Sequence, residues 1–239
     1  MIEKQVDDFL IYLNYEKKYS SNTIRAYKKD LSDFRLFIKK ESIESFIDIK
    51  KQHIHQFLYF LSLKKNKERT VARKLASIKS LFNFLVMKNI LKNNIVRTIS
   101  APKIDKKLPV FLTQDKMSLL LDLPKTSNIS ESRDILILEL FYSAGVRISE
   151  LVKIKIEDIN FENNSISITG KGNKNRLVII GNYAKKRLLD FLNYNKGIKT
   201  GFLFKNERKS KAGHISERFV FNIVKKHVQK VTNNQKISP

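Results

Sequence analysis

The sequence has no cysteine and no tryptophan, and it contains only four histidines, four prolines and seven glycines. Without cysteine, the 239-residue chain cannot form disulfides or thiolate zinc sites, which excludes zinc fingers and disulfide scaffolds. No apolar run is long enough to cross a bilayer, and the first eight residues are too polar for a signal peptide. We therefore expect a cytoplasmic protein with no membrane partner.

Acidic residues are also scarce, with 23 Asp and Glu against 47 Lys and Arg, for a net charge of +24. The excess is shared, because residues 1–100 hold 21 basic and 10 acidic residues and residues 101–239 hold 26 and 13. A basic excess in both halves predicts a polyanionic partner such as a nucleic acid. A generally basic or ribosome-associated protein fits the charge alone equally well.

The first hundred residues predict four helices. Apolar residues recur at spacings of three and four over residues 3–16, 24–38, 55–61 and 71–85, and Ser20 to Asn22 offer capping side chains before the second helix. The pattern predicts a four-helix bundle in residues 1–99.

Basic residues dominate the second half of this bundle. Between Lys50 and Ser100 there are twelve basic residues and one acidic residue, Glu68. A solvated helix surface usually mixes charges of both signs, so the pattern favours phosphate contact over a plain solvated face. The predicted DNA contacts are Arg25, Lys28, Lys29, Lys64, Lys65, Lys67, Arg69, Arg73 and Lys74.

Residues 100–112 contain two prolines and three lysines without sustained periodicity, which predicts an interdomain linker before a second domain at 113–239. Thr113 is placed to cap a helix, and the nearly all-apolar run 132–143 predicts a buried central helix. Arg147 follows this helix after Gly145, and Ser149 is placed to cap the next short helix.

A β-hairpin should follow, because residues 166–169 and 176–180 have strand character and the turn between them is rich in Gly, Asn and Lys. Lys171 lies in this turn. Residues 182–192 and 216–230 then show helical periodicity, and Phe202 to Phe204 predict a short strand or an apolar anchor.

An arginine at a helix turn and a lysine at a hairpin tip suit phosphate chemistry, because Arg can hold two phosphate oxygens and Lys can carry a proton. The segments Ala-Gly-Val-Arg-Ile-Ser-Glu-Leu at 144–151 and Gly-Lys-Gly-Asn-Lys-Asn-Arg at 170–176 together resemble the first half of a tyrosine recombinase site. The resemblance is strongest to bacterial Xer-type enzymes, and it covers nearly the whole chain.

This resemblance implies a mainly α fold, with an N-terminal SAM-like core-binding bundle that grips duplex DNA and a mixed α/β catalytic domain with a small antiparallel sheet. It implies DNA cleavage through a 3′-phosphotyrosine intermediate without metal or cofactor. Arg147 then matches a phosphate-binding arginine and Lys171 the general acid for the 5′-oxygen. Glu150 matches an acidic position to which we assign an orienting role, and Lys174 and Arg176 are interpreted as phosphate or structural contacts rather than catalysts.

Each of these residues has a simpler interpretation when taken singly. Arg147 could be a surface helix cap, Glu150 a solvent-facing partner of Lys153, and Lys171 a polar hairpin tip. The joint pattern, with its glycines and spacing, favours the functional interpretation.

The chain departs from the family pattern after Lys171. The resemblance implies a His-x-x-Arg motif and a nucleophilic tyrosine there, but His214 begins His-Ile-Ser-Glu, His227 begins His-Val-Gln-Lys, and Tyr194 is the last tyrosine. We interpret Tyr183 and Tyr194 as packing residues. The expectation is a recombinase truncated before its second motif, whether as a gene product, a pseudogene or a cloned fragment, which binds DNA but does not cleave it alone.

The resemblance also implies a role and a partner. Strand exchange between short DNA sites for chromosome dimer resolution, hence chromosome partition at cell division, is the expected lineage role, with a second recombinase subunit, identical or paralogous, in a tetrameric synapse. The alternatives are a phage or mobile-element integrase and a non-catalytic protein that occupies or competes for recombination sites. A basic RNA-binding protein lacks support because no stacking motif is present.

Overall fold

The computed structural model describes residues 2–105, 110–122, 128–170, 172, 174–195, 200–206, 212–233 and 237. The chain divides into two compact units, Met1–Lys107 and Leu108–Pro239, called unit 1 and unit 2 below. Each unit has its own apolar core.

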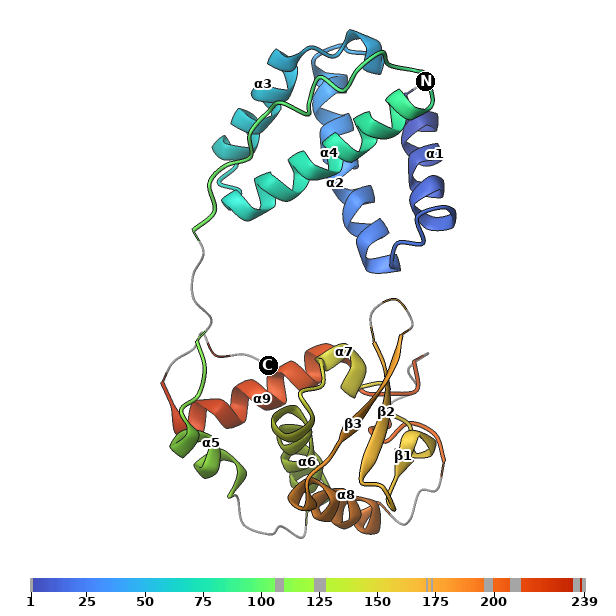
Figure 1. The fold of residues 1–239 in the computed structure, drawn as a ribbon. Helices are drawn as coiled ribbons and strands as arrows, with labels where there is room; N and C mark the ends of the chain where they lie inside the picture. The colour runs from blue at the N-terminus through green and yellow to red at the C-terminus, as the bar shows by residue number, and fades with distance from the viewer. Residues whose placement is uncertain are drawn as a thin grey trace. The chain divides into compact units, whose positions relative to one another are not determined.

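Within residues 2–105, unit 1 has the four α-helices expected from the apolar periodicity. They are α1 (Ile2–Tyr15), α2 (Ser21–Lys40), α3 (Lys51–Leu63) and α4 (Glu68–Met87), with a short 3-10 helix η1 (Phe46–Asp48) before α3. Figure 1 shows α2 and α4 side by side, and these two helices contact each other. The Ser20 side chain caps α2 by accepting the Thr23 N–H at 3.3 Å, which satisfies one of the free donors at the helix start.

Aromatic side chains fill the centre of unit 1. The Phe57 ring of α3 lies 5.1 Å from the Phe34 ring and 5.3 Å from the Phe37 ring, both on α2. Phe46 of η1 packs edge-on against Phe82 of α4 at 5.8 Å. Tilted and edge-on ring pairs at these distances add to the hydrophobic stabilisation, so the segment between α2 and α3 is anchored in the core.

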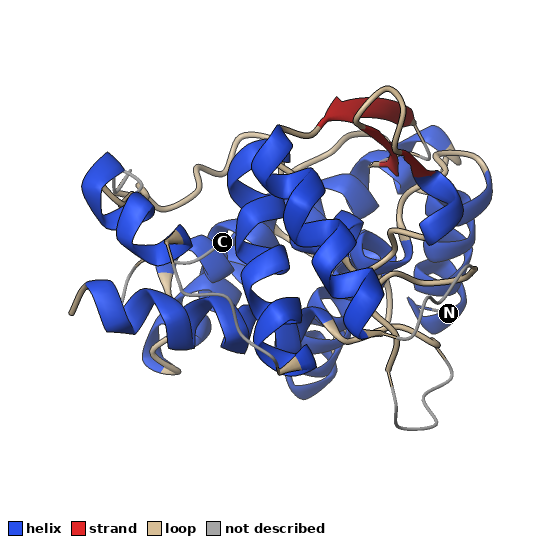
Figure 2. Cartoon of the chain, turned by 90° about the horizontal axis from the view of Figure 1, so that it is seen from below, coloured by secondary structure: helices blue, strands red, loops and turns tan. Residues whose placement is uncertain are grey.

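Helices also make up most of the described part of unit 2 (Figure 2). They are α5 (Gln114–Leu121), α6 (Ile129–Ala144), α7 (Ile148–Leu151), α8 (Asn182–Tyr194) and α9 (Glu217–Val231), with a 3-10 helix η2 (Ile156–Asp158). α6 contacts α5, α8, α9 and the sheet, and Leu136, Ile137 and Leu140 are fully buried. The predicted central helix is therefore confirmed.

A small antiparallel sheet lies next to these helices. Among the described residues, β1 (Ile159–Asn160), β2 (Ser165–Thr169) and β3 (Asn175–Ile179) pair in the order β1-β2-β3. The β2–β3 register runs from Ser165 opposite Ile179 to Thr169 opposite Asn175, which confirms the predicted hairpin. β1 was not predicted, because two residues are too short to show an alternating pattern.

Three helix starts differ from the sequence-based expectation. Thr113 precedes α5, but its side chain makes no capping hydrogen bond. Ser149 lies inside α7 rather than before it, and the carboxylate of Glu150 takes the capping role. Asn182, whose side chain the sequence offers as a cap for the helix at 182–192, is instead the first residue of α8, and Gly181 holds the cap position. At α7 and α8 the helix begins at or before the residue expected to cap it, whereas Thr113 holds the cap position of α5 without the hydrogen bond.

Leu203 and Phe204 are buried in unit 2, and the Leu203 N–H donates to the carbonyl of Ile154 at 2.8 Å. Phe202 forms an isolated bridge with Lys155. This segment is thus the apolar anchor of the two options that the sequence left open.

Candidate functional site

Arg147 lies at the turn between the buried helix α6 and the short helix α7. α6 ends at Ala144, and the next residue, Gly145, has a φ of 55°, in the left-handed region that glycine adopts without strain. Arg147 then takes the cap position of α7, and its side chain is 70% exposed. The turn therefore projects a guanidinium into solvent from a rigid support.

The carboxylate of Glu150 accepts hydrogen bonds from this arginine. It accepts the Arg147 backbone N–H at 2.9 Å and the Arg147 Nη1 at 3.0 Å. It also accepts Nη1 and Nη2 of Arg176 on β3, at 2.9 and 2.8 Å, which is the bidentate geometry of a strong ion pair. Because Glu150 is only 4% exposed, its interpretation as a solvent-facing partner of Lys153 is wrong.

The two arginines fix the charge of Glu150. Hydrogen bonds from Arg176, together with the backbone and side-chain hydrogen bonds from Arg147, lower the pKa of Glu150 to about 2 even though burial opposes this shift. The same pairing raises the pKa of Arg176. At neutral pH the cluster holds two positive charges and one negative charge, and Arg147 is the more exposed of the two arginines.

Gly170, at the end of β2, completes the packing of this cluster. A Cβ at this position would lie 3.1 Å from Arg176 Nη1 and 3.1 Å from Glu150 Oε1. The Gly170 N–H donates to the Lys174 carbonyl at 2.8 Å and so closes the base of the hairpin turn. A side chain at position 170 would press on this ion pair unless Arg176 and Glu150 shifted by a few tenths of an ångström.

The structure describes two of the three hairpin residues that were predicted for the site. Lys171, the predicted general acid, lies outside the described residues. Lys174 is exposed. Arg176 places both Nη atoms on Glu150 and so makes a structural contact, and its predicted phosphate contact stays a prediction.

The basic residues predicted in unit 1 lie on α2, on the turn between α3 and α4, and on α4. Exposed side chains among them are Arg25, Lys28, Lys29, Lys64, Lys65, Lys67, Arg69 and Arg73. Lys74 is only 4% exposed and its ammonium pairs with Asp33 and with Asp30. Its prediction as a DNA contact is wrong, because burial and two carboxylates keep it from reaching another anion.

A hollow of about 370 Å³ borders Glu150 in unit 2 and is lined by Lys153, Lys155, Ser167, Thr169 and His214 among others. His214 packs edge-on against Phe202 at 4.9 Å, and its Nδ1 lies 2.7 Å from the Ile215 carbonyl oxygen. Among the residues that the structure describes, no three His, Cys, Asp or Glu side chains are grouped to hold a metal ion.

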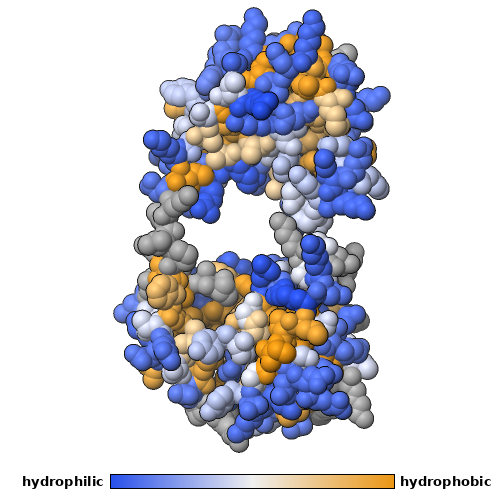
Figure 3. All heavy atoms as spheres, viewed as in Figure 1, coloured by the Kyte–Doolittle hydropathy of each residue, from blue (hydrophilic) through white to orange (hydrophobic). Residues whose placement is uncertain are grey.

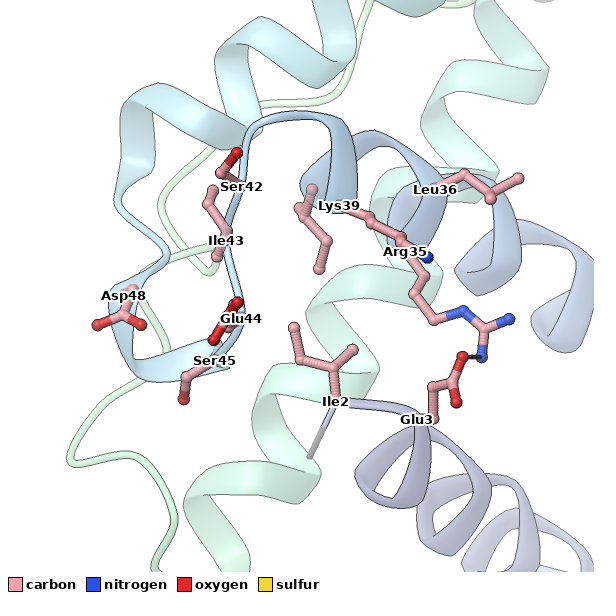
Figure 4. Close-up of a pocket in the computed structure, with 11 residues that line it drawn as sticks. Ile2, Glu3, Arg35, Leu36, Lys39, Ser42, Ile43, Glu44, Ser45 and Asp48 are labelled. Atoms are coloured by element: carbon pink, nitrogen blue, oxygen red, sulfur yellow. Dashed lines mark ion pairs between the residues drawn. The ribbon is translucent and has the colours of Figure 1, made fainter.

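Unit 1 has a hollow of about 910 Å³ between the start of α1, the second half of α2 and the segment leading into η1. In Figure 4, Arg35 and Glu3 reach toward each other at its edge, and their ion pair measures 3.2 Å. Acidic, basic and apolar side chains all line it. Figure 3 shows hydrophilic and hydrophobic residues interspersed over the visible face of each unit. None of the predicted DNA contacts lines this hollow.

Buried polar residues on α6 were not indicated by the sequence. Asp134 pairs with Arg133 at 2.7 Å, and its other oxygen lies 3.3 Å from Nε2 of His227 on α9. Glu139 is also buried, and burial raises its pKa. The only sequence signal was a polar residue inside an apolar helical run, which does not reveal a partner on a distant helix.

The interpretation of two tyrosines as packing residues is wrong. Tyr183 on α8 is 81% exposed, and Tyr194 at the end of the same helix is 44% exposed. Their apolar neighbours Ala184, Leu188 and Phe191 occupy the buried side of α8 instead.

No helix in the described part of the chain is long and apolar enough to cross a membrane.

Two family models match the chain. Residues 6–89 match the N-terminal SAM-like domain of phage integrases, and residues 110–239 match the phage integrase family. The second match covers more than half of the chain and includes Arg147, Glu150 and Arg176. The chain belongs to the phage integrase family of tyrosine recombinases, with an Xer-type sequence.

Relatives with curated names support the same family assignment. The tyrosine recombinase XerC of Thermodesulfovibrio yellowstonii is 35% identical over 98% of this chain and 78% of its own length. The XerC of Syntrophus aciditrophicus is 32% identical over 100% of this chain and 81% of its own length.

Solved structures share the fold. The XerH recombinase bound to its difH substrate has a TM-score of 0.68 at 19% identity, covering 98% of this chain and 71% of that chain. A lambda integrase tetramer bound to a Holliday junction has a TM-score of 0.70 at 15% identity, covering 97% of this chain and 66% of that chain. The mainly helical fold with a small antiparallel sheet is thus that of the integrase family.

Proposed function

We propose that this chain binds duplex DNA at a recombination site, with Arg147 contacting the phosphate at the point of strand exchange. The observation that carries the proposal is the arrangement of Arg147, Glu150 and Arg176: an exposed arginine held by a buried carboxylate, which a second arginine neutralises. A prearranged cation of this kind stabilises the charge that develops on a phosphate during transfer. Lys171, in the hairpin turn, supplies the proton for the leaving 5′-oxygen in this proposal.

Residues 1–99 form the main DNA-binding domain in this proposal, residues 100–112 the linker, and residues 113–239 an incomplete catalytic domain. Lys and Arg side chains that neutralise phosphates release counterions, so binding should weaken steeply as salt rises. Support comes from the net charge of +24 and from the exposure of the predicted unit 1 contacts other than Lys74. XerH and lambda integrase, which share the fold, are bound to DNA in their solved structures.

Strand cleavage by this chain alone is not part of the proposed function. Residues 172–239 contain no His-x-x-Arg motif, and the two tyrosines among them lie on α8. Cleavage requires a nucleophile that exchanges a DNA ester for a protein ester, together with the arginine of the His-x-x-Arg motif. Catalytic groups of one site act as a unit, so a chain without this arginine and without the nucleophile should have essentially no turnover.

The test combines binding and covalent capture. Labelled duplex carrying candidate sites is titrated with the chain at several salt concentrations, and a nicked suicide substrate is run with it on a denaturing gel. We expect salt-dependent binding and no covalent adduct. Arg147→Ala should weaken binding, whereas Lys153→Ala, which removes an exposed cation outside the Glu150 cluster, should change it less. An adduct would contradict the proposal, and mapping it would name the nucleophile.

For the lineage we propose a cellular role in chromosome dimer resolution, and hence in chromosome partition. The proposed location is the cytoplasm, and the proposed partner is an identical or paralogous recombinase. The competing proposal is a non-catalytic protein that occupies or competes for recombination sites. A phage or mobile-element integrase is the third possibility. Reading the genomic DNA beyond the codon for Pro239 separates the first two, because an in-frame His-x-x-Arg and tyrosine there would support an active recombinase.

A further inference from the structure

A fully buried carboxylate lies between α2 and α4 of unit 1. Asp30 of α2 is 0% exposed and accepts a hydrogen bond from Ser77 Oγ of α4 at 3.1 Å. It also pairs with Arg73 through Nη1 and with Lys74, whose Nζ lies 3.4 Å from its other oxygen. A buried carboxylate is stable only when such partners satisfy it, so Asp30 fixes the side chains around it.

The two cations of this cluster differ in what they can still do. Lys74 is buried and also pairs with Asp33, so two carboxylates share its charge. Arg73 is held by Asp30 through one nitrogen, and its side chain remains 46% exposed. A guanidinium has five N–H donors in a rigid fork, so Arg73 can bind a second anion while one side of the fork stays on Asp30.

We propose that Asp30 is a positioning residue that holds the Arg73 guanidinium ready for a phosphate of duplex DNA. This role rests on the proposed DNA-binding function. Arg69 lies one helical turn before Arg73 and is also exposed, so both arginines share one face of α4. The arrangement repeats in unit 1 what Glu150 does for Arg147 in unit 2: a buried carboxylate holds an exposed arginine.

The sign of the effect separates this role from simple electrostatics. Asp30 contributes a negative charge, so its removal should strengthen binding to a polyanion if only charge mattered. If Asp30 positions Arg73, its removal should weaken binding. The two explanations therefore predict opposite changes for Asp30→Asn, a substitution that keeps the size of the side chain.

The experiment measures the affinity of the full chain for labelled duplex DNA by fluorescence anisotropy at four salt concentrations. The variants are Asp30→Asn, Arg73→Ala, their double mutant, and Asp33→Asn as the matched control, because Asp33 pairs with Lys74 but not with Arg73. Circular dichroism checks that each variant is folded.

We expect Asp30→Asn to weaken binding by roughly 3- to 10-fold, the size of the net contribution of a typical hydrogen bond. Arg73→Ala should lower the magnitude of the salt slope by about 0.9, as for one lost phosphate contact. Asp30→Asn should then have no further effect when Arg73 is already Ala, and Asp33→Asn should bind as well as the wild type or more tightly.

Equal or tighter binding by Asp30→Asn would overturn the role of Asp30, and so would an undiminished effect in the Arg73→Ala background. A wild-type chain that does not bind duplex DNA would instead overturn the proposed function and this role with it. If Asp30→Asn does not fold, Arg73→Lys serves as the second variant. It keeps the charge but not the fork, so it should lose about as much affinity as Arg73→Ala, and wild-type affinity for Arg73→Lys would overturn the proposal.

Discussion

Replacing Glu150 with Gln should destabilise unit 2 in a way that depends on pH. The substitution keeps the shape of the side chain but removes the charge that two guanidiniums share at 2.8 to 3.0 Å. The arginines then lose their counter-charge in a site where the acid is almost fully buried. Leaving charges without their partner in such a site is the costly part of the change.

The pKa of Glu150 gives the magnitude. It is lowered from 4.5 to about 2, and each unit corresponds to about 1.4 kcal/mol, so the pairing stabilises the folded state by about 3 kcal/mol. Arg147 is 70% exposed, and screening by solvent reduces this to roughly 2 kcal/mol. We expect Glu150→Gln to lower the free energy of unfolding by that amount at pH 7.

The pH dependence follows from the sign of the shift. Because the folded-state pKa lies below the unfolded-state value, the stabilisation is complete above about pH 4.5 and is lost as the pH falls toward 2. The difference between wild type and Glu150→Gln should therefore narrow to about half its neutral value near pH 3.

Urea unfolding followed by circular dichroism at pH 7, 5, 4 and 3 measures this difference, and peptide-resolved hydrogen exchange assigns it to unit 2. Glu162→Gln is the matched control, because Glu162 is an exposed acid of the same unit. A difference between Glu150→Gln and wild type that stays constant from pH 7 to pH 3 would refute the electrostatic reasoning.

Three glycines give further predictions. Gly170→Ala should weaken DNA binding and lower the melting temperature, because its Cβ would lie 3.1 Å from Arg176 Nη1 and Glu150 Oε1; an unchanged melting temperature would contradict this. Gly145→Ala should cost about 1 kcal/mol in the free energy of unfolding, because the position has a φ of 55° but open space around the Cβ. Gly181→Ala should also be destabilising despite open space and a φ of −70°, because glycine is a better helix N-cap residue than alanine. Urea unfolding measures both costs, and an unchanged free energy of unfolding for Gly145→Ala would show that the left-handed φ carries no strain.

The main helices and the hairpin could be predicted from the sequence because their signals are local. Apolar residues three and four apart mark the buried side of α2 and α4, and the apolar run of α6 marks a helix that is covered on most sides. Helix starts were less predictable. Several neighbouring side chains can cap the same helix start. At α7 the side chain that accepts the hydrogen bond is that of Glu150, the third residue of the helix, rather than that of Ser149.

Partners across the fold could not be predicted. Lys74 and Arg73 are adjacent in the sequence and equally basic, yet one is buried between two acids and the other is half exposed. The difference comes from the packing of α4 on α2, where Asp30 and Asp33 lie more than forty residues earlier in the chain. Likewise, the pairing of Glu150 with Arg176 depends on the fold of the hairpin beside α7.

The hydrogen bond between Arg147 and Glu150 also has an entropic consequence. A free arginine side chain loses up to about 2 kcal/mol of rotamer freedom when a ligand fixes it. In this protein the carboxylate beneath Arg147 has already restricted that freedom, although most of the side chain faces solvent. A phosphate that meets Arg147 therefore encounters a side chain whose ordering was completed when the chain folded, and more of the contact energy remains for holding the phosphate itself.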